Sequence, residues 1–136
     1  MRRLDWHARF QAEILAAQSR EFQWGMHDCT LFVAKVVDAM TDGDYAQRIT
    51  RDLPHTTEAE TLRLIEQYGG LRKLVSRYLS QEIPYGWAQE GDVVLLRDAE
   101  GHEVLGICEG VQAICAFKTG VAPLSMARAI CAWRIE

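Results

Sequence analysis

The sequence lacks a long apolar segment and has no concentration of basic residues. Its longest apolar run, residues 31–40, is interrupted by Lys35 and Asp38 and is far shorter than the roughly 20 residues that a membrane-spanning helix needs. The 15 lysine and arginine residues are outnumbered by 19 acidic ones, and no basic run could follow a phosphate backbone. We therefore expect no membrane span and no nucleic-acid partner.

Patterns for secretion and for metal binding are missing as well. The N-terminus, MRRLDWHARFQAEIL, carries charged residues where a signal peptide needs an unbroken apolar stretch, so we expect no signal peptide. No two cysteines form a C-x-x-C pair, which argues against a zinc or iron–sulfur site, and we expect no metal and no cofactor. Without a secretory signal, free thiols are expected at all four cysteines: Cys29, Cys108, Cys115 and Cys131.

The sequence also has no internal repeat and no Pro/Gly/Ser linker, which predicts one domain over residues 1–136. Its character changes near residue 80: helical patterns fill about residues 1–80, and strand patterns fill about residues 90–136. The strand patterns are VVLLR, VLGIC, AICAF and ICAWRI, separated by turns, and they predict an antiparallel meander. Helices followed by strands indicate an α+β fold in which the helices pack against a small C-terminal sheet.

Four helices are expected in the first part. An apolar stripe predicts a helix over residues 4–19, and an aspartate N-cap opens a second, largely buried helix over residues 28–40. The capping-box pattern T-x-x-E opens a third helix over residues 57–68. Apolar residues three and four positions apart predict a fourth over residues 71–78. Residues 41–56 show turn chemistry and little periodicity, so we expect a surface loop there.

Cys29, at the start of the second predicted helix, allows two interpretations. The first turn of a helix favours a thiolate, because unsatisfied N–H groups and the helix dipole point at it, so Cys29 is a candidate nucleophile. The neighbouring N–H groups could also hold an oxyanion. Alternatively, Cys29 is a small buried residue, which is the commoner role of a lone cysteine beside an apolar helix. Whether the predicted loop at residues 41–56 covers this position stays open.

Three motifs, in order, resemble the NlpC-like branch of the papain-fold cysteine peptidases. They are WGMHDCTLFVA, GDVVLL at residues 91–96 and VLGICEG at residues 104–110. In these peptidoglycan-cleaving enzymes a W-G-G-like segment precedes D-C-S-G-L, a G-D-L-V-F-F strand follows, and H-V-G-I-Y-x-G supplies the base. The resemblance implies a papain-like fold with Cys29 as the nucleophile.

The whole chain also resembles a group of phage and prophage tail-gene-cluster proteins. These share W-G-x-x-D-C, G-D-V-V-L, L-G-I and a closing A-W-R-I with this sequence. This second resemblance implies other tail-tip or baseplate proteins as partners. It also implies a location in the virion tail, after assembly in the host cytoplasm.

When the family's motifs are matched to this sequence, two of the three catalytic positions hold residues that are unsuited to their role. The base of H-V-G-I falls at Val104, and valine cannot accept a proton. The third, orienting residue of the family falls near Cys115 or Ala116, and neither is suited to hold an imidazole.

Three other residues are candidates for the missing roles. His102 has the same strand parity as Val104 but lies roughly 6–7 Å back along an extended strand, so it could act as the base only if a bulge recovers that distance. Otherwise His102 is a solvated turn residue. His27 is an oxyanion-donor candidate or simply a polar loop residue. Gln23 lies six residues before Cys29, the offset of the oxyanion-hole glutamine in papain-like proteases, or is an exposed loop residue.

Two hypotheses follow. The first is a structural or assembly protein of a phage tail tip or baseplate, with an NlpC-like fold and a degenerate catalytic site. The second is an active cysteine endopeptidase or amidase on peptidoglycan peptides, with Cys29 as nucleophile and His102 as an unconventional base. We prefer the first because of the missing base at Val104; fold alone does not give function.

Overall fold

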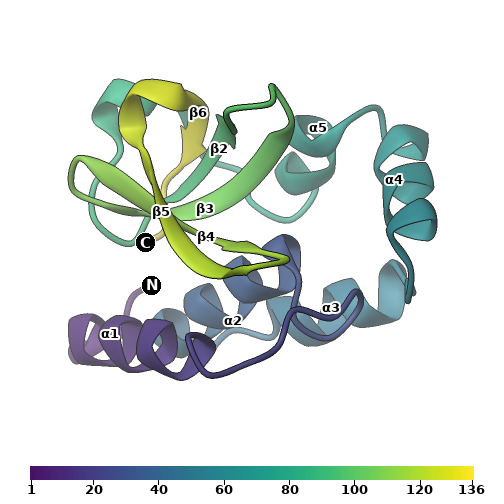
Figure 1. Ribbon diagram of the computed structural model, residues 1–136. Helices are drawn as coiled ribbons and strands as arrows, with labels where there is room; N and C mark the ends of the chain where they lie inside the picture. Colours follow the sequence, from purple (N-terminus) through teal and green to yellow (C-terminus); the bar gives the residue numbers. More distant parts are fainter.

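Helices make up the first half of the chain, and antiparallel strands make up the second half. The computed structural model describes residues 1–136, and its elements are α1 (Trp6–Ala17), α2 (Cys29–Thr41), α3 (Tyr45–Asp52), α4 (Glu58–Gln67), α5 (Leu71–Ser76), β1 (Glu82–Ile83), η1 (Tyr85–Trp87), β2 (Val93–Arg97), β3 (Glu103–Glu109), β4 (Gln112–Phe117), β5 (Gly120–Ser125), η2 (Met126–Arg128) and β6 (Ala129–Trp133). In Figure 1, α1, α2 and α3 form a layer along one face of a curved sheet, and α4 and α5 stand at one end of it. The predicted α+β class is confirmed.

The helices with clear sequence signals form where those signals lie. Asp28 caps α2, because its Oδ1 accepts a hydrogen bond from the N–H of Leu31 at 2.9 Å. Thr57 caps α4 in the same way, with its Oγ1 accepting from the N–H of Glu60 at 3.1 Å. The predicted first and fourth helices correspond to α1 and α5, each shorter than expected.

The prediction of a surface loop at residues 41–56 is wrong, because α3 lies within this segment. The cap of α3 comes from another helix: Asp38 in α2 accepts hydrogen bonds from the N–H groups of Tyr45 at 2.8 Å and Ala46 at 3.0 Å. Ile49 then buries the inner face of α3. Because the capping group lies outside the segment, no local pattern indicates this helix.

The sheet has six strands in the order β1-β6-β2-β3-β4-β5, and every pairing is antiparallel. Strands β2, β3, β4 and β6 were expected, but the predicted meander is incomplete. The chain adds β5 at one edge and then returns, so that β6 pairs with β2. Edge strand β5 contains Gly120 and Pro123, and its apolar and polar residues do not alternate regularly. Strand β1 has only two residues. Neither strand therefore has a strong signal in the sequence.

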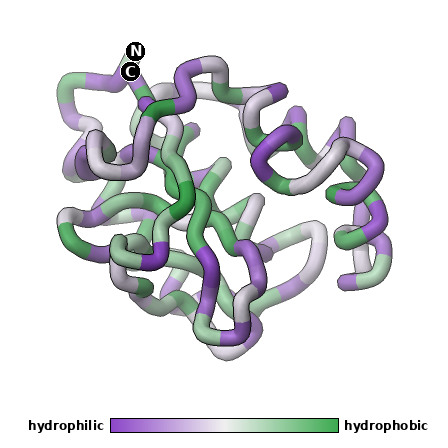
Figure 2. The backbone as a smooth tube through the Cα atoms, turned by 90° about the horizontal axis from the view of Figure 1, so that it is seen from above, coloured by the Kyte–Doolittle hydropathy of each residue, from purple (hydrophilic) through white to green (hydrophobic).

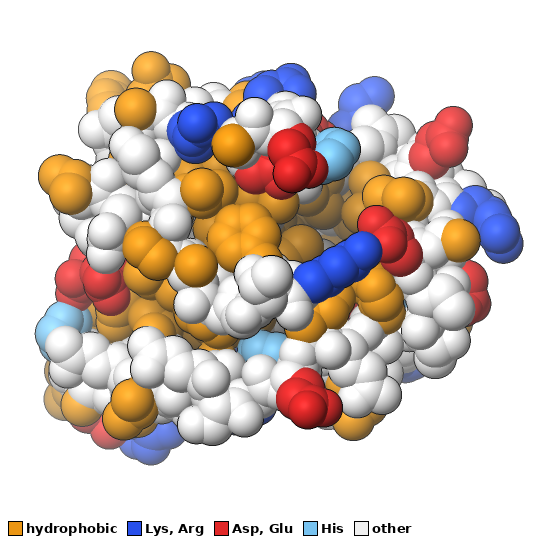
Figure 3. Space-filling view, viewed as in Figure 1, with side chains coloured by type: hydrophobic (Ala, Val, Ile, Leu, Met, Phe, Trp, Pro, Cys, Tyr) orange, Lys and Arg blue, Asp and Glu red, His pale blue; other side chains and the backbone are white.

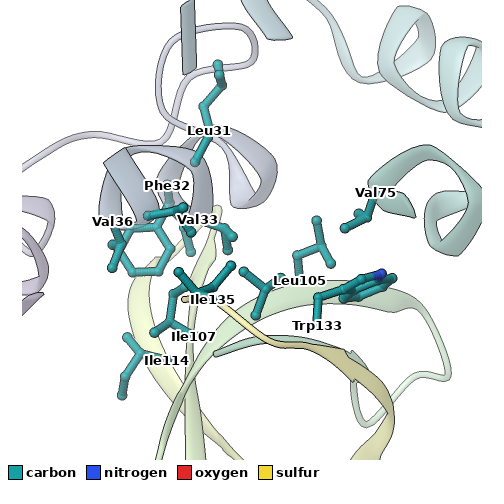
Figure 4. Packing of buried hydrophobic residues seen from close by; sticks show 14 of the residues in the cluster. Leu31, Phe32, Val33, Val36, Val75, Leu105, Ile107, Ile114, Trp133 and Ile135 are labelled. Atoms are coloured by element: carbon teal, nitrogen blue, oxygen red, sulfur yellow. The ribbon is translucent and has the colours of Figure 1, made fainter. Parts of the chain in front are cut away.

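The main core lies between the helical layer and the sheet. Figure 4 shows Phe32 and Val36 of α2 pointing toward Leu105 and Ile107 of β3, with Trp133 of β6 beside them. A smaller apolar cluster lies on the opposite face of the curved sheet. No helix combines the length and the apolar character that crossing a bilayer requires.

Both ends of the chain meet at one buried carboxylate. The guanidinium of Arg2 donates to Asp92 Oδ1 at 2.9 Å and to the carbonyl oxygens of Ile135 at 2.7 Å and Glu90 at 2.8 Å. The N–H of Ile135 donates to the same Asp92 oxygen at 3.0 Å. Figures 1 and 2 both show the two termini close together. Asp92, from the GDVV motif, therefore fastens the N-terminal segment to the last residues of the chain.

Candidate functional site

Cys29 lines a groove with a cavity volume of about 670 Å³, hereafter the Cys29 groove. Its walls come from the segment before α2, from α4, from the β2–β3 turn and from the β4–β5 turn. Apolar side chains lining it include Phe22, Trp24, Leu62, Ile65, Leu71, Val104, Ala116 and Phe117. Figure 3 shows hydrophobic side chains in a hollow on this face, with charged side chains at its edge. Glu58 and Lys118, both of which line the groove, form an ion pair at 2.7 Å.

A tight turn before α2 fixes the position of Cys29. The backbones of Gln23 and His27 form an isolated bridge, with hydrogen bonds of 2.9 and 2.8 Å. Gly25 has φ +82°, and a Cβ at this position would overlap the carbonyl oxygen of His55, so only glycine fits here. The N–H of Gly25 donates to Asp28 Oδ2 at 3.0 Å. The turn and the N-cap together make Cys29 the first residue of α2.

The Cys29 thiol is held in its neutral form. Burial raises its pKa, and the negative charge of Asp28 raises it further; hydrogen bonds to the Leu105 backbone and to Thr30 oppose this only in part. The sulfur lies 3.9 Å from Thr30 Oγ1 and forms no hydrogen bond with any histidine. The thiolate expected from the helix start is thus not favoured, because burial of the sulfur and the Asp28 charge outweigh the effect of the helix terminus, although the residue as a whole is only half-buried.

His102 lines the Cys29 groove from the turn between β2 and β3, with 73% of its side chain exposed. Its Nδ1 lies 3.7 Å from Asp98 Oδ2 and 3.6 Å from Glu100 Oε2, so the imidazole faces acidic groups of its own turn. Pairing of β2 with β3 is regular from Val93↔Ile107 to Arg97↔Glu103. The bulge that would have moved His102 toward the sulfur is therefore absent.

The positions that match the family's base and orienting residue carry aliphatic side chains in the same groove. Val104 on β3 and Ala116 on β4 both line it together with Cys29. Cys115, the other candidate for the third position, is fully buried in the apolar cluster on the opposite face of the sheet. The groove thus brings Cys29 together with Val104 and Ala116, whose side chains cannot accept a proton.

The two oxyanion candidates lie outside the lining of the groove. His27 is buried, packs edge-on against Phe32 at 6.2 Å between ring centroids, and has no hydrogen-bond partner at Nδ1. Burial lowers its pKa, with smaller contributions from Lys35 and Arg20. Gln23 is exposed, and only its backbone is engaged, in the turn. No residue of 41–56 lines the groove either, so this segment does not cover it.

Sequence reasoning missed His55, which is buried behind the start of α2. Its Nε2 lies 2.7 Å from Asp28 Oδ2, and its Nδ1 lies 2.5 Å from the carbonyl oxygen of Leu53. The partners Asp28 and His55 are 27 residues apart in the sequence, and no local motif joins them. Only the aspartate next to Cys29, a buried charge in need of a partner, could have suggested a search for one.

One group of side chains could in principle hold a metal ion. Asp98, Glu100 and His102 each offer one ligand atom, and these atoms all lie within 4.8 Å of one another. Glu100 and His102 are exposed, and exposed acidic groups such as Glu100 are common without a metal ion.

Comparisons with known proteins agree with this architecture. The family described as "Domain of unknown function (DUF6950)" matches residues 1–135. The chain is similar to the crystal structure of the NlpC/p60 domain of the peptidoglycan hydrolase SagA, with a TM-score of 0.51 and 20% sequence identity over 93% of this chain and 97% of that one. No curated protein matches the sequence. At this identity the likeness concerns the fold, and the chain has an NlpC/p60-like, papain-type fold.

Proposed function

The chain belongs to the DUF6950 family, and we propose that it is a non-hydrolytic protein on an NlpC/p60-like fold, a structural or assembly component of a phage tail tip or baseplate. Its partners in this proposal are other tail proteins, and its location is the virion tail after assembly in the host cytoplasm. The Cys29 groove is then the remnant of a hydrolase site.

One observation supports the proposal that the protein is not a hydrolase. Cys29 shares its groove with Val104 and Ala116, at the two positions where a cysteine hydrolase of this fold needs a base and an orienting residue. No histidine hydrogen-bonds the sulfur, and burial keeps the thiol protonated. A neutral thiol with no base within hydrogen-bonding distance is a poor nucleophile.

The phage part is supported by the sequence. The motifs W-G-x-x-D-C, G-D-V-V-L, L-G-I and the closing A-W-R-I resemble phage and prophage tail-gene-cluster proteins. Two of these motifs have structural roles in the chain: Asp28 caps α2, and Asp92 holds Arg2 and the C-terminal segment. Their retention is what a protein that keeps the fold without the chemistry would need.

The competing candidate is an active endopeptidase or amidase on peptidoglycan peptides. It is favoured by the fold and by the position of Cys29 at the start of α2 inside a groove. Purified peptidoglycan, incubated with the protein or with Cys29→Ala, separates the two. We expect no released muropeptides from either protein. Release by the wild type that is lost in Cys29→Ala would overturn the non-hydrolytic role.

The assembly role has its own test. Particles would be produced from a phage genome that carries the gene, from the same genome without it, and from one that carries Cys29→Ala. We expect defective tails without the gene and normal, infectious particles with Cys29→Ala. Intact tails in the absence of the gene would contradict the assembly role, whatever the muropeptide result.

A further inference from the structure

The Asp28–His55 pair is the most constrained polar contact near Cys29, and neither of the sequence-based hypotheses uses it. Asp28 is 1% exposed and His55 is 8% exposed. The two side chains belong to separate parts of the chain, the start of α2 and the segment between α3 and α4. Three donors converge on the Asp28 carboxylate: the N–H of Leu31 on Oδ1, and the N–H of Gly25 and the His55 ring on Oδ2.

The hydrogen bonds determine where protons lie on the pair. A carbonyl oxygen can only accept, so the His55 Nδ1 that faces the Leu53 carbonyl must carry a proton. At the other nitrogen, a second proton must lie between Nε2 and Asp28 Oδ2, since two bare acceptors 2.7 Å apart would repel. With both protons in place, the pair has no net charge wherever the shared proton resides.

This neutrality bears on the thiol one residue away. Asp28 is the charged group with the largest effect on Cys29, and its negative charge raises the pKa of that thiol. The other ionisable side chains that line the groove are Glu58, Arg97, Asp98, His102, Glu103 and Lys118, and none of them is among the main causes of the Cys29 pKa shift. His55, whose Nε2 lies 2.7 Å from Asp28 Oδ2, is the partner that offsets the negative charge of the Asp28 carboxylate.

We propose that His55 is a positioning residue for Cys29: through its proton-sharing contact with Asp28 it locks the turn at Gly25 and the first residue of α2, and it shields the thiol from the carboxylate. This inference goes beyond the proposed function, because it assigns control of the Cys29 environment to a histidine outside the groove. The backbone of His55 also packs against the turn, since a Cβ on Gly25 would overlap the His55 carbonyl oxygen.

Alkylation of Cys29 by iodoacetamide as a function of pH, followed on the Cys29 peptide by mass spectrometry, tests the proposal. We expect His55→Gln to slow alkylation at pH 8 by about tenfold, because an unshielded buried carboxylate shifts a neighbouring pKa by about one unit. Asp28→Asn keeps an N-cap acceptor and removes a carboxylate that His55 already offsets, so alkylation should change far less than in His55→Gln. His7→Gln, which removes an exposed histidine of α1 that pairs with Glu90 and does not line the groove, is the matched control and should leave the rate unchanged.

Wild-type rates in His55→Gln, together with a changed rate in Asp28→Asn, would overturn the proposal, since His55 would then have no effect through Asp28. If His55→Gln does not fold, nitrogen NMR of the imidazoles in the wild-type protein replaces it. We expect a proton on His55 Nδ1 and a second proton shared between Nε2 and Asp28 Oδ2. An unprotonated Nδ1 would overturn the proposal. Muropeptide release would overturn the proposed function but leave these results standing, because alkylation requires no hydrolysis.

Discussion

At the sulfur of Cys29 two opposing physical effects act on one thiol. The N-terminus of α2 favours the thiolate, while burial and the carboxylate of Asp28 favour the neutral form and prevail. In a working cysteine hydrolase an adjacent imidazole reverses this balance by taking the proton. The Cys29 groove contains no such arrangement: no imidazole hydrogen-bonds the sulfur, and Val104, at the position proposed for the base, also lines the groove.

Val104→Ala and Val104→His separate these effects. We expect Val104→His to lower the thiol pKa and to accelerate alkylation of Cys29 at pH 7 by about tenfold or more, because a basic ring would share the groove with the sulfur. Val104→Ala is the control for altered packing and should accelerate alkylation far less. Equal rates in the two variants would show that position 104 does not face Cys29. They would contradict the assignment of Val104 to the position of the family's base.

Residues close together in the sequence could be placed in advance, and residues far apart could not. The motifs place Cys29 at a helix start, where α2 begins, and of the two positions they leave open for the third residue, Ala116 lines the groove and Cys115 does not. They did not reveal His55, because its contact with Asp28 depends on how the chain returns after α3. His27 and Gln23 are proposed from their distance in sequence to Cys29, whereas neither of them lines the groove.

At the scale of elements, helices whose N-cap lies next to them in the sequence are predictable, and the helix whose capping group lies in another element is not. Helices α2 and α4 carry their own N-caps, Asp28 and Thr57, and were predicted. Helix α3 takes its cap from Asp38 in α2, and the residue at its own N-cap position, Asp44, makes no capping hydrogen bond. Strand β5 was missed because its pairing with β4, rather than its composition, holds it in place.

A pair of aspartate variants checks this account of α3. We expect Asp38→Ala to lower the free energy of unfolding by about 1–2 kcal/mol, because two backbone N–H groups lose their acceptor. Asp44→Ala, at the nominal cap position, should have a clearly smaller effect, since its side chain makes only a long contact with Arg48 at 3.9 Å. Urea unfolding measures both. A larger loss in Asp44→Ala would contradict the assignment.

At the scale of the whole molecule, the fold is closed by Asp92, where the first residues, the start of β2 and the C-terminal segment meet. Arg2 lies against this carboxylate with 17% of its side chain exposed, and Asp92 with 1%. Removing one partner of a largely buried ion pair is costly, and Arg134, whose Nε lies 3.9 Å from Asp92 Oδ2, would offset only part of the remaining charge. We expect Arg2→Ala to lower the free energy of unfolding by about 3 kcal/mol, measured by urea unfolding.

Arg9→Ala is the matched control for the Arg2 prediction, because Arg9 pairs with Asp5 on the exposed side of α1. An exposed ion pair contributes little, so this variant should unfold close to the wild type. If Arg2→Ala proved as mild as Arg9→Ala, the Asp92 contact would not fasten the two ends of the chain.

The buried thiols make the stability of the whole fold sensitive to alkaline pH. Burial raises the pKa of Cys131 to about 11 and of Cys115 to about 12, against an ordinary value of 9.0. A raised pKa in the folded state stabilises the fold below the unfolded pKa, and this contribution is lost as the pH rises above it. We expect the free energy of unfolding to fall between pH 9 and 11 by about 1.4 kcal/mol per pH unit for each such thiol.

Cys115→Ala tests the thiol contribution against the lysines and tyrosines that also titrate there. Its free energy of unfolding should fall less steeply with pH than that of the wild type. The difference in slope should equal the contribution of one thiol. An identical slope in the two proteins would mean that Cys115 is not held neutral by burial.

The pH dependence of Cys29 alkylation in the unmodified protein tests the central claim most directly. The account predicts a midpoint above 9.0, the ordinary value for a cysteine thiol, because burial and Asp28 both hold the proton on the sulfur and no imidazole removes it. A midpoint near or below neutral pH would reveal a thiolate paired with a base. It would contradict both the geometry of the groove and the non-hydrolytic role.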